Sequence, residues 1–355
     1  MNRRICVAAV MLAALGACGD DQGGTPAPAA KAPAFPQVMA VRETDPVDTA
    51  EDAADDPAIW VDPADPSRSV IIGTAKKSGL FVYGLDGKQM QFLPEGRVNN
   101  VDLRTVKLDG KETVVVAASD RAAKGIALYE LDPATRQVSS LAERQPSGFV
   151  DPYGLCLYHS LATGQLYVVM TDKEKNGAQW RIDSAGGKVT AVKVRDLPLA
   201  TQSEGCVADD QGATVYVAEE GNGIWAFPAE PDQPAEGKLV VSIAANPKLA
   251  ADLEGLAIHH GESGRYLIAS SQGNNSYAVF RMGAALDYLG SFAIAPGAVD
   301  GTSETDGLDV VSAPLGADFP QGLLVVQDGA NTDPAANQNF KLVSWADAAK
   351  ALGLK

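Results

Sequence analysis

The chain has 355 residues, enough for one large domain or two small ones. Its hydrophobic content of 46% and charged content of 21% are ordinary for a globular protein with a buried core. The formal net charge is -16, which argues against nucleic acid and anionic membrane surfaces as partners, because both attract basic patches.

The N-terminal residues have the pattern of an export signal. Arg3 and Arg4 precede an apolar run that ends in Leu-Gly-Ala-Cys at Cys18. This pattern resembles a bacterial lipoprotein signal peptide, whose cleavage leaves an acylated cysteine, and a simple secretory signal is the alternative. We expect residues 1–17 to be a signal peptide and Cys18 to carry the only membrane anchor. The mature protein would be an outer-membrane or periplasmic lipoprotein, or otherwise secreted.

One domain is predicted after a linker. Residues 18–36 are rich in Gly, Pro and Ala, which is typical of a flexible tether. The domain is expected to span 37–355. Its first segment, 37–44, is strand-like but lies outside six internal repeats that fill the rest of the domain. We expect this segment to pair with the last repeat as its outer strand, which would join the two ends of the domain into a ring.

A unit of about fifty residues recurs six times. Each unit opens with a polar residue before a short apolar strand, and two further β-branched or aromatic strands follow. Only residues 346–353 hint at a helix. The pattern predicts an all-β fold, a six-bladed β-propeller whose innermost strands face a central channel. The intervals between unit starts are 46, 51, 51, 50 and 52 when the starts are marked by Asp56, Asp102, Tyr153, Glu204, Glu254 and Asp306.

Two cysteines, Cys156 and Cys206, lie inside the predicted domain. An oxidising compartment would permit a disulfide between them. Aligning Gly154 with Gly205, however, places Leu155 opposite Cys206, and the alternation of side chains along a strand then points the two sulfurs toward different faces. We therefore expect two free, buried thiols.

Charged residues at the strand ends are sorted by sign around the predicted ring. In the first three units the turn after the second strand carries cations, whereas in the fourth unit it carries acids, and most strand starts are acidic. The cations are Lys76, Lys77, Arg121 and Lys173. The acids and their polar neighbours are Asp55, Asp56, Glu204, Glu219, Glu220, Asp252, Glu254, Gln272 and Asp306, with Tyr153 at one strand start.

This sorting indicates a chemistry. Oxygen ligands without histidine or cysteine are typical of a Ca²⁺ site, and Lys and Arg suit an anion such as phosphate. Together they indicate metal-assisted hydrolysis of a phosphate ester. His159, His259 and His260 fall at the far ends of the first strands, where we expect structural roles, so a Ser-His-Asp triad lacks its base. The sequence has no Walker loop, CxxC pair or dinucleotide fingerprint.

Several long motifs resemble those of the β-propeller phytases. They include DAADDPAIWVDP, AKKSGLFVYGLDGK, QSEGCVADD, VYVAEEGNGIW, DGTSETDGLDV and NQNFKLVSW, in order over about residues 40–347. The resemblance implies a calcium-dependent phosphoric monoester hydrolase of the 3-phytase type. Its substrate would be phytate (myo-inositol hexakisphosphate) or calcium phytate. We expect a monomer with several catalytic and structural calcium ions.

The resemblance also implies three sets of site residues. The phosphate-binding and catalytic set would be Lys76, Arg121, Tyr153, Lys173 and Glu204. The catalytic calcium ligands would be Asp55, Glu204, Glu220, Asp252, Glu254, Gln272 and Asp306, with Glu43. The stabilising calcium ligands, several through backbone carbonyls, would be Asp56, Pro57, Val101, Asp300, Asn337, Gln338 and Asn339. This last set would tie the first unit to the last, so calcium is expected to stabilise ring closure. Glu304 is expected to be solvated.

Two other functions fit part of the pattern. A lactonase-type propeller hydrolase with one divalent metal would explain the acids but not the cations. A non-enzymatic propeller that serves as a binding module would explain the fold but not the sorting by sign.

Overall fold

A computed structural model describes residues 35–261 and 264–354. The expected signal peptide (1–17), Cys18 and the tether, apart from residues 35 and 36, lie outside the described residues. The described residues belong to a compact unit, Ala34–Lys355. In this part of the chain no helix has the length and hydrophobicity needed to cross a membrane.

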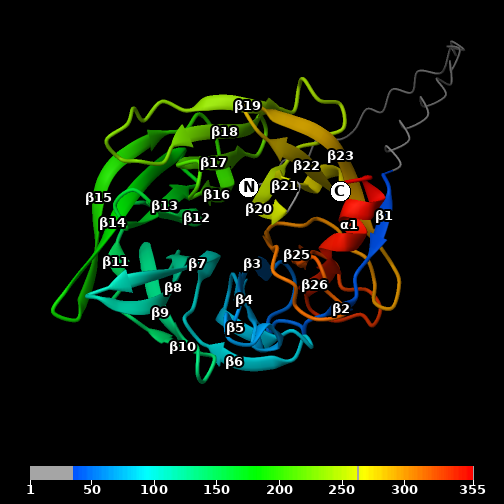
Figure 1. The fold of residues 1–355 in the computed structure, drawn as a ribbon, viewed down its shortest axis with the longest axis horizontal. Coiled ribbons are helices and arrows are strands. Elements are labelled where there is room, and N and C mark those ends of the chain that lie inside the picture. Colours follow the sequence, from blue (N-terminus) through cyan, green and yellow to red (C-terminus); the bar gives the residue numbers. More distant parts are fainter. Residues whose placement is uncertain (1–34, 262–263, 355) are drawn as a thin grey trace, which may run out of the picture. The chain divides into compact units, whose positions relative to one another are not determined.

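The described residues form six β-sheets around a central axis, which confirms the predicted six-bladed propeller (Figure 1). In each sheet, consecutive strands run from the axis outward and pair antiparallel. Blades one to three are built from β3 (Ala54–Trp60), β4 (Val70–Ala75), β5 (Gly79–Gly84), β6 (Gln89–Leu93); β7 (Val98–Leu108), β8 (Lys111–Asp120), β9 (Gly125–Asp132), β10 (Gln137–Ser140); and β12 (Pro152–His159), β13 (Leu166–Asp172), β14 (Asn176–Ala185), β15 (Lys188–Pro198). Blades four to six are built from β16 (Ser203–Asp209), β17 (Thr214–Glu219), β18 (Gly223–Pro228), β19 (Lys238–Ser242); β20 (Leu253–Gly261), β21 (Gly264–Ser271), β22 (Ser276–Met282), β23 (Leu286–Ala295); and β24 (Leu308–Val311), β25 (Leu323–Asp328), β26 (Asn339–Ser344).

A few short elements complete the blades. The strand β11 (Gln145–Pro146) pairs with β9 beside β10. Two short 3-10 helices cover Pro66–Arg68 and Gln272–Asn274. The one α-helix among the described residues, α1 (Trp345–Ala351), lies where the sequence hinted at a helix, and it buries Trp345 and Ala348.

The N-terminal segment closes the ring at two blades. The strand β2 (Arg42–Glu43) pairs antiparallel with β26, so the predicted outer strand of the last blade is present. The strand β1 (Gln37–Met39) instead pairs parallel with β23 of blade five. Figure 1 shows this blue segment passing beside the orange and red C-terminal strands. The segment therefore fastens blade five as well as blade six.

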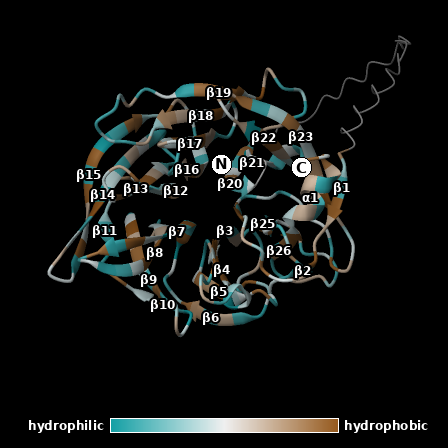
Figure 2. Ribbon diagram, viewed as in Figure 1, coloured by the Kyte–Doolittle hydropathy of each residue, from teal (hydrophilic) through white to brown (hydrophobic). Residues whose placement is uncertain are grey.

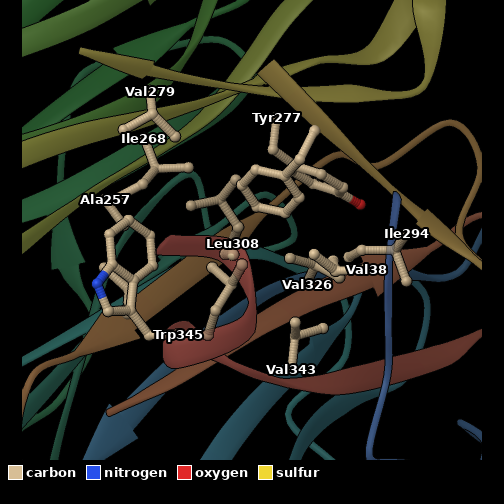
Figure 3. Packing of buried hydrophobic residues seen from close by; sticks show 14 of the residues in the cluster. Val38, Ala257, Ile268, Tyr277, Val279, Ile294, Leu308, Val326, Val343 and Trp345 are labelled. Carbon is tan, nitrogen blue, oxygen red and sulfur yellow. The ribbon is translucent and has the colours of Figure 1, made fainter. Parts of the chain in front are cut away.

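The core is divided into six hydrophobic clusters, one at each interface between neighbouring blades. Figure 2 shows hydrophobic residues distributed over all six blades. Figure 3 shows the cluster between blades five and six, where Ile268 and Leu308 pack near Val343 and Trp345. Because side chains alternate along a strand, one residue faces the preceding blade and the next residue faces the following blade. Burying each large side chain contributes about 1.5–3 kcal/mol, so every interface is a substantial source of stability.

This alternation explains why the expectation of two free thiols is wrong. Cys156 and Cys206 form a disulfide, with their Cα atoms 5.4 Å apart. Leu155 belongs to the cluster between blades two and three, whereas Cys156 and Cys206 belong to the cluster between blades three and four. Opposite faces of successive blades pack against each other, so the two sulfurs meet because they point toward different faces of their own sheets.

Candidate active site

One residue from each blade is held at the same place, in the turn after the second strand. Its backbone N–H donates to a carbonyl oxygen that precedes or opens the first strand of its own blade, and every such N–O distance lies between 2.7 and 3.2 Å. All six positions therefore lie on one face of the ring. In blade order the residues are Lys76, Arg121, Lys173, Glu220, Gln272 and Gly329. Lys77 and Glu219, which are adjacent in sequence, make other contacts: Lys77 donates to the Ala50 carbonyl, and Glu219 accepts from Thr201 and Trp225.

In blades one to five, a second residue is presented by a β-bulge in the innermost strand. The register of this strand shifts in blades one to five, for example between Ser203 and Cys206. A bulge re-aims the side chains that it contains. The equivalent residues are Asp55, Asn99, Tyr153, Glu204 and Glu254, with Asp306 in blade six.

Glycines allow these bulges to pack closely. A Cβ atom on Gly154 would overlap the carbonyl oxygen of Glu204, and a Cβ atom on Gly205 would overlap the carbonyl oxygen of Glu254. The inner strands of neighbouring blades therefore approach each other where Tyr153, Glu204 and Glu254 are presented.

The expected unit starts differ from the equivalent positions in the first two blades, by one residue in blade one, where Asp55 and not Asp56 is equivalent, and by three in blade two. Asn99, not Asp102, occupies the equivalent position there. Asp102 lies farther along β7, where it accepts from the Leu157 N–H and from Arg104 (both 2.8 Å). It lines a cavity of about 390 Å³ together with Asp56, Val101 and Asp309. The signal for Asn99 was its place two residues before Val101, matching Asp55 before Pro57.

Three glutamates form the centre of an acidic cluster. One carboxylate oxygen each from Glu204, Glu220 and Glu254 lies within 4.8 Å of the others. Glu204 and Glu254 are buried. Burial is the main reason that the pKa values of Glu204 and Glu254 are well above the usual range, and repulsion from neighbouring carboxylates raises them further. Burial likewise raises the pKa of Glu220, and Asp252 raises it further.

Lys76 joins two more carboxylates to this cluster. Its Nζ lies 3.2 Å from Asp55 Oδ2 and 2.7 Å from Asp306 Oδ2, and Gln272 donates to the other oxygen of Asp306 at 2.7 Å. Burial, with repulsion from Asp55, raises the pKa of Asp306 to about 7. Burial alone would lower the pKa of Lys76, but attraction to Asp55 and Asp306 outweighs it and raises that pKa.

The cations Lys173 and Arg121 surround Tyr153, beside the glutamate cluster. The Lys173 ammonium lies 4.3 Å from the centre of its ring and the Arg121 guanidinium 5.9 Å. Arg121 is fixed by two bonds to Asp151 (2.8 and 2.7 Å). The buried Tyr153 hydroxyl lies in hydrogen-bond contact with Glu204, and burial and that acid raise its pKa. Tyr153 is therefore the meeting point of the basic and acidic residues.

The residues expected to bind stabilising calcium lie in two places. The Asp56 carboxylate accepts from the Val101 N–H at 3.0 Å and joins blades one and two. It lines the axial cavity beside Pro57 and Val101. In the ring-closing region, Asn337 donates to the Val47 carbonyl and Gln338 accepts from the Ala53 N–H. These amides bind the N-terminal loop to the last blade.

Glu43 lies in the ring-closing region and not with the glutamate cluster. Its carboxylate is 2.5 Å from the Lys341 Nζ, which also contacts Asp300 and lies 3.1 Å from Asp328. Asn339 accepts from the same ammonium at 3.0 Å, and Lys341 is fully buried. A lysine ammonium therefore lies at the centre of this set, and calcium binding by Glu43, Asp300 and Asn339 stays a prediction.

The glutamate cluster, in contrast, fits a cation. The Oδ1 atom of Asp55 and the Oε2 atom of Glu254 are buried and have neither a hydrogen bond nor an ion pair among the described residues, whereas Asp55 Oδ2 pairs with Lys76. The donors are all hard oxygen atoms, which suit Ca²⁺ rather than zinc or copper. Crowded carboxylates repel one another unless protons or cations intervene. The arrangement can hold a metal ion beside side chains that bind an anion.

Comparison with known proteins gives a consistent match. The family model described as Phytase matches residues 5–355. The 3-phytase of Bacillus subtilis (strain 168) is 45% identical over 328 residues, which cover 89% of this chain and 86% of that protein.

Solved structures with similar folds are far more distant in sequence. The calcium-binding protein regucalcin from Agrobacterium tumefaciens has a TM-score of 0.52 and 14% identity, over 87% of this chain and 96% of that chain. The PQQ-bound aldose sugar dehydrogenase from Streptomyces coelicolor has a TM-score of 0.50 and 11% identity, over 86% and 97%. At these identities the likeness shows the fold alone.

Proposed function

This chain belongs to the phytase family, and on that premise we propose that it hydrolyses phytate with calcium held by the acidic cluster. The observation that carries the proposal is the position of Glu204 and Glu254 beside the cations that surround Tyr153. A protein with a net charge of -16 can take a polyanionic substrate only where positive charge is supplied locally.

The reaction replaces one bond to phosphorus by another. The P–O bond to the inositol ring breaks, and the oxygen of a water molecule joins the phosphorus. One proton of that water passes to the leaving alcohol oxygen, so the products are inorganic phosphate and a less phosphorylated inositol.

The cationic side chains bind and orient the phosphate. The Arg121 guanidinium is held in place by Asp151, so it presents a preorganised positive charge. Lys173 is exposed over the Tyr153 ring and can reach an incoming phosphate oxygen. Lys76 lies at the boundary of the acids and cations, and it orients the carboxylates of Asp55 and Asp306.

The acidic residues would hold calcium. The ligands would be the carboxylates of Asp55, Glu204, Glu220, Asp252, Glu254 and Asp306, together with the Gln272 amide. When bound, calcium would neutralise these carboxylates and polarise phosphate and water oxygens. This site also accounts for the cations, which neither a lactonase-type hydrolase nor a binding module requires.

Phosphate release from phytate tests this function. The purified protein is expected to release inorganic phosphate in calcium, to lose this activity in a calcium chelator, and to regain it when calcium is restored. No release in calcium would contradict phytate hydrolysis. Undiminished release in chelator would contradict the calcium proposal and leave the substrate standing. Hydrolysis of an aldonolactone in place of phytate would support the lactonase alternative.

We also propose that the protein is exported and anchored by a lipid on Cys18, and that it is a monomer. The support is the N-terminal sequence pattern for the first statement and the closed ring of six blades for the second. Radiolabelled palmitate should enter the wild-type protein but not Cys18→Ser. Light scattering of the soluble domain should give the mass of one chain.

A further inference from the structure

We propose that Asn99 is a positioning residue that fixes the acidic and the cationic parts of the site relative to each other. This inference rests on the proposed function, because it assigns a role within that site. Asn99 occupies, in blade two, the bulge position that carries Asp55, Tyr153, Glu204 and Glu254 in other blades. It is the neutral amide in a ring of ionisable groups.

Asn99 acts from beneath the surface. Its exposed fraction is 0%, so a substrate bound at the mouth cannot touch it directly. Any effect of this side chain on the reaction must therefore pass through the groups to which it is hydrogen-bonded.

The Asn99 amide joins one residue of each charge. Its Nδ2 atom donates to Glu204 Oε1, and its Oδ1 atom accepts from Arg121 Nη1 at 3.1 Å. Glu204 belongs to the glutamate cluster, and Arg121 belongs to the cations around Tyr153. The amide therefore sets the spacing between a proposed metal ligand and a proposed phosphate-binding group.

The backbone around Asn99 is also fixed to the next blade. The Asn100 N–H donates to Ser119 Oγ at 3.0 Å, and the Ser119 hydroxyl donates to the Tyr153 carbonyl at 2.5 Å. The bulge in blade two is thus tied to the bulge that carries Tyr153.

The chemistry of the two partners requires an amide. A carboxylate such as Glu204 needs a donor, and a guanidinium such as Arg121 needs an acceptor. Aspartate at position 99 would keep the acceptor and lose the donor, whereas leucine would lose both at a similar volume. These two substitutions therefore separate the two arms of the proposed role.

The test compares Asn99→Asp and Asn99→Leu. Turnover of phytate gives kcat and KM in calcium, and calorimetric titration of inorganic phosphate gives a Kd that does not depend on turnover. Asn99→Asp is expected to lower kcat about 10–100-fold, as outer-shell substitutions do, with the phosphate Kd within about twofold of wild type. Asn99→Leu is expected to lower kcat similarly and also to weaken phosphate binding about tenfold, because Arg121 loses its acceptor.

Gln179→Leu is the matched control. Gln179 is equally buried, accepts from Arg195 Nε at 2.7 Å and donates to the Ala229 carbonyl at 2.8 Å, so it also links an arginine to a neighbouring blade. It belongs to β14 and contacts no residue of the proposed site. Its replacement is expected to lower the thermal midpoint while kcat and the phosphate Kd of the folded enzyme stay unchanged.

The outcomes are distinguishable. Wild-type values in both Asn99 variants would overturn the proposal. Equal losses of phosphate affinity in the Asp and Leu variants, or losses no larger than those of Gln179→Leu, would also overturn it. A wild-type enzyme that releases no phosphate from phytate contradicts the proposed function instead, and the calorimetric Kd values would still report whether Asn99 positions Arg121.

Discussion

Two carboxylate clusters in the same molecule differ in how far the chain's own cations neutralise them. Near the axis, buried Asp55 Oδ1 and Glu254 Oε2 have no hydrogen bond and no ion pair among the described residues. At the ring closure, Glu43, Asp300 and Asp328 surround the ammonium of Lys341. Burying carboxylates is unfavourable in both places, but only the second cluster contains a fully buried cation from the chain itself.

The difference separates a binding site from a structural joint. A buried charge can persist when a partner is supplied by the fold or when a ligand arrives to supply it. The ring-closing cluster has its partner permanently, so it contributes to stability without any ligand. The cluster near the axis consists of the glutamate cluster with Asp55 and Asp306, and it is called the axial cluster below. Its carboxylates lack enough positive charge from the chain, so it can bind a metal ion. The following changes test this contrast, from the largest expected effect to the smallest.

Replacing Lys341 should have the largest effect. Lys341→Met leaves three carboxylates without their cation, and breaking a buried ion pair costs about 3–5 kcal/mol of unfolding free energy. Denaturant unfolding of the calcium-free protein measures the loss. Added calcium should raise the thermal midpoint of this variant more than that of wild type, because the emptied cluster now accepts an ion.

The exposed Lys350 provides the control for that variant. Lys350→Met should leave the unfolding free energy within about 0.5 kcal/mol of wild type, as substitutions at exposed positions usually do. A Lys341→Met protein as stable as Lys350→Met would show that the ammonium does not neutralise the ring-closing cluster.

Removing the disulfide tests whether calcium binding by the axial cluster depends on the covalent bond between blades three and four. Cys206 lies two residues from Glu204, and the bond closes a loop of 50 residues. The double variant Cys156→Ser/Cys206→Ser should lose about 2–4 kcal/mol of unfolding free energy, mainly because its unfolded chain is less restricted. Because the effect lies in the unfolded state, calcium should stabilise the variant as much as it stabilises wild type. A loss of that calcium response would mean that the disulfide shapes the axial cluster itself.

The pH dependence of calcium stabilisation should give the smallest and most specific effect. Burial and repulsion from Asp55 raise the pKa of Asp306 to about 7 from the ordinary 3.8. Between about pH 4 and 7 the folded state then holds this proton more tightly than the unfolded state, so the contribution of Asp306 to the stability of the calcium-free protein falls as pH rises. Calcium competes with these protons. It should raise the thermal midpoint by more degrees at pH 8 than at pH 5.

Scanning calorimetry with and without calcium at the two pH values measures this difference. A midpoint that calcium does not move at pH 8 would contradict binding at the axial cluster. An equal shift at both pH values would mean that the ion binds without displacing protons.

The fold could be predicted from the sequence because its repeat is local. Each unit carries its own strands and turns, and six apolar strand sets at similar spacing favour one closed ring. Pairing of the N-terminal segment was predicted only for blade six. The parallel pairing of β1 with β23 could not be predicted, because the three residues of β1 (Gln37–Met39) are too few to show a sequence pattern.

The site could be predicted less completely, because β-bulges and packing between blades are not visible in a single strand. The bulge in blade two places Asn99 at the equivalent position beneath the site, whereas the spacing of the units predicts Asp102. Contacts between successive blades decide that Cys156 meets Cys206. The sequence analysis does not assign a role to Lys341, although a lysine between two apolar residues of a strand is a signal for a buried ion pair.

The ring closure also sets the order in which the molecule can be assembled. Glu43 and Lys341 are 298 residues apart in the chain. The strand β2 can therefore pair only after β26 has been synthesised. Contacts of such long range slow folding, and until they form the edges of blades five and six stay unpaired. A chain cut before Lys341 would lack most of β26 and leave the outer edge of blade six open. Pairing of β2 with β26 therefore distinguishes a completely folded chain from an incomplete one.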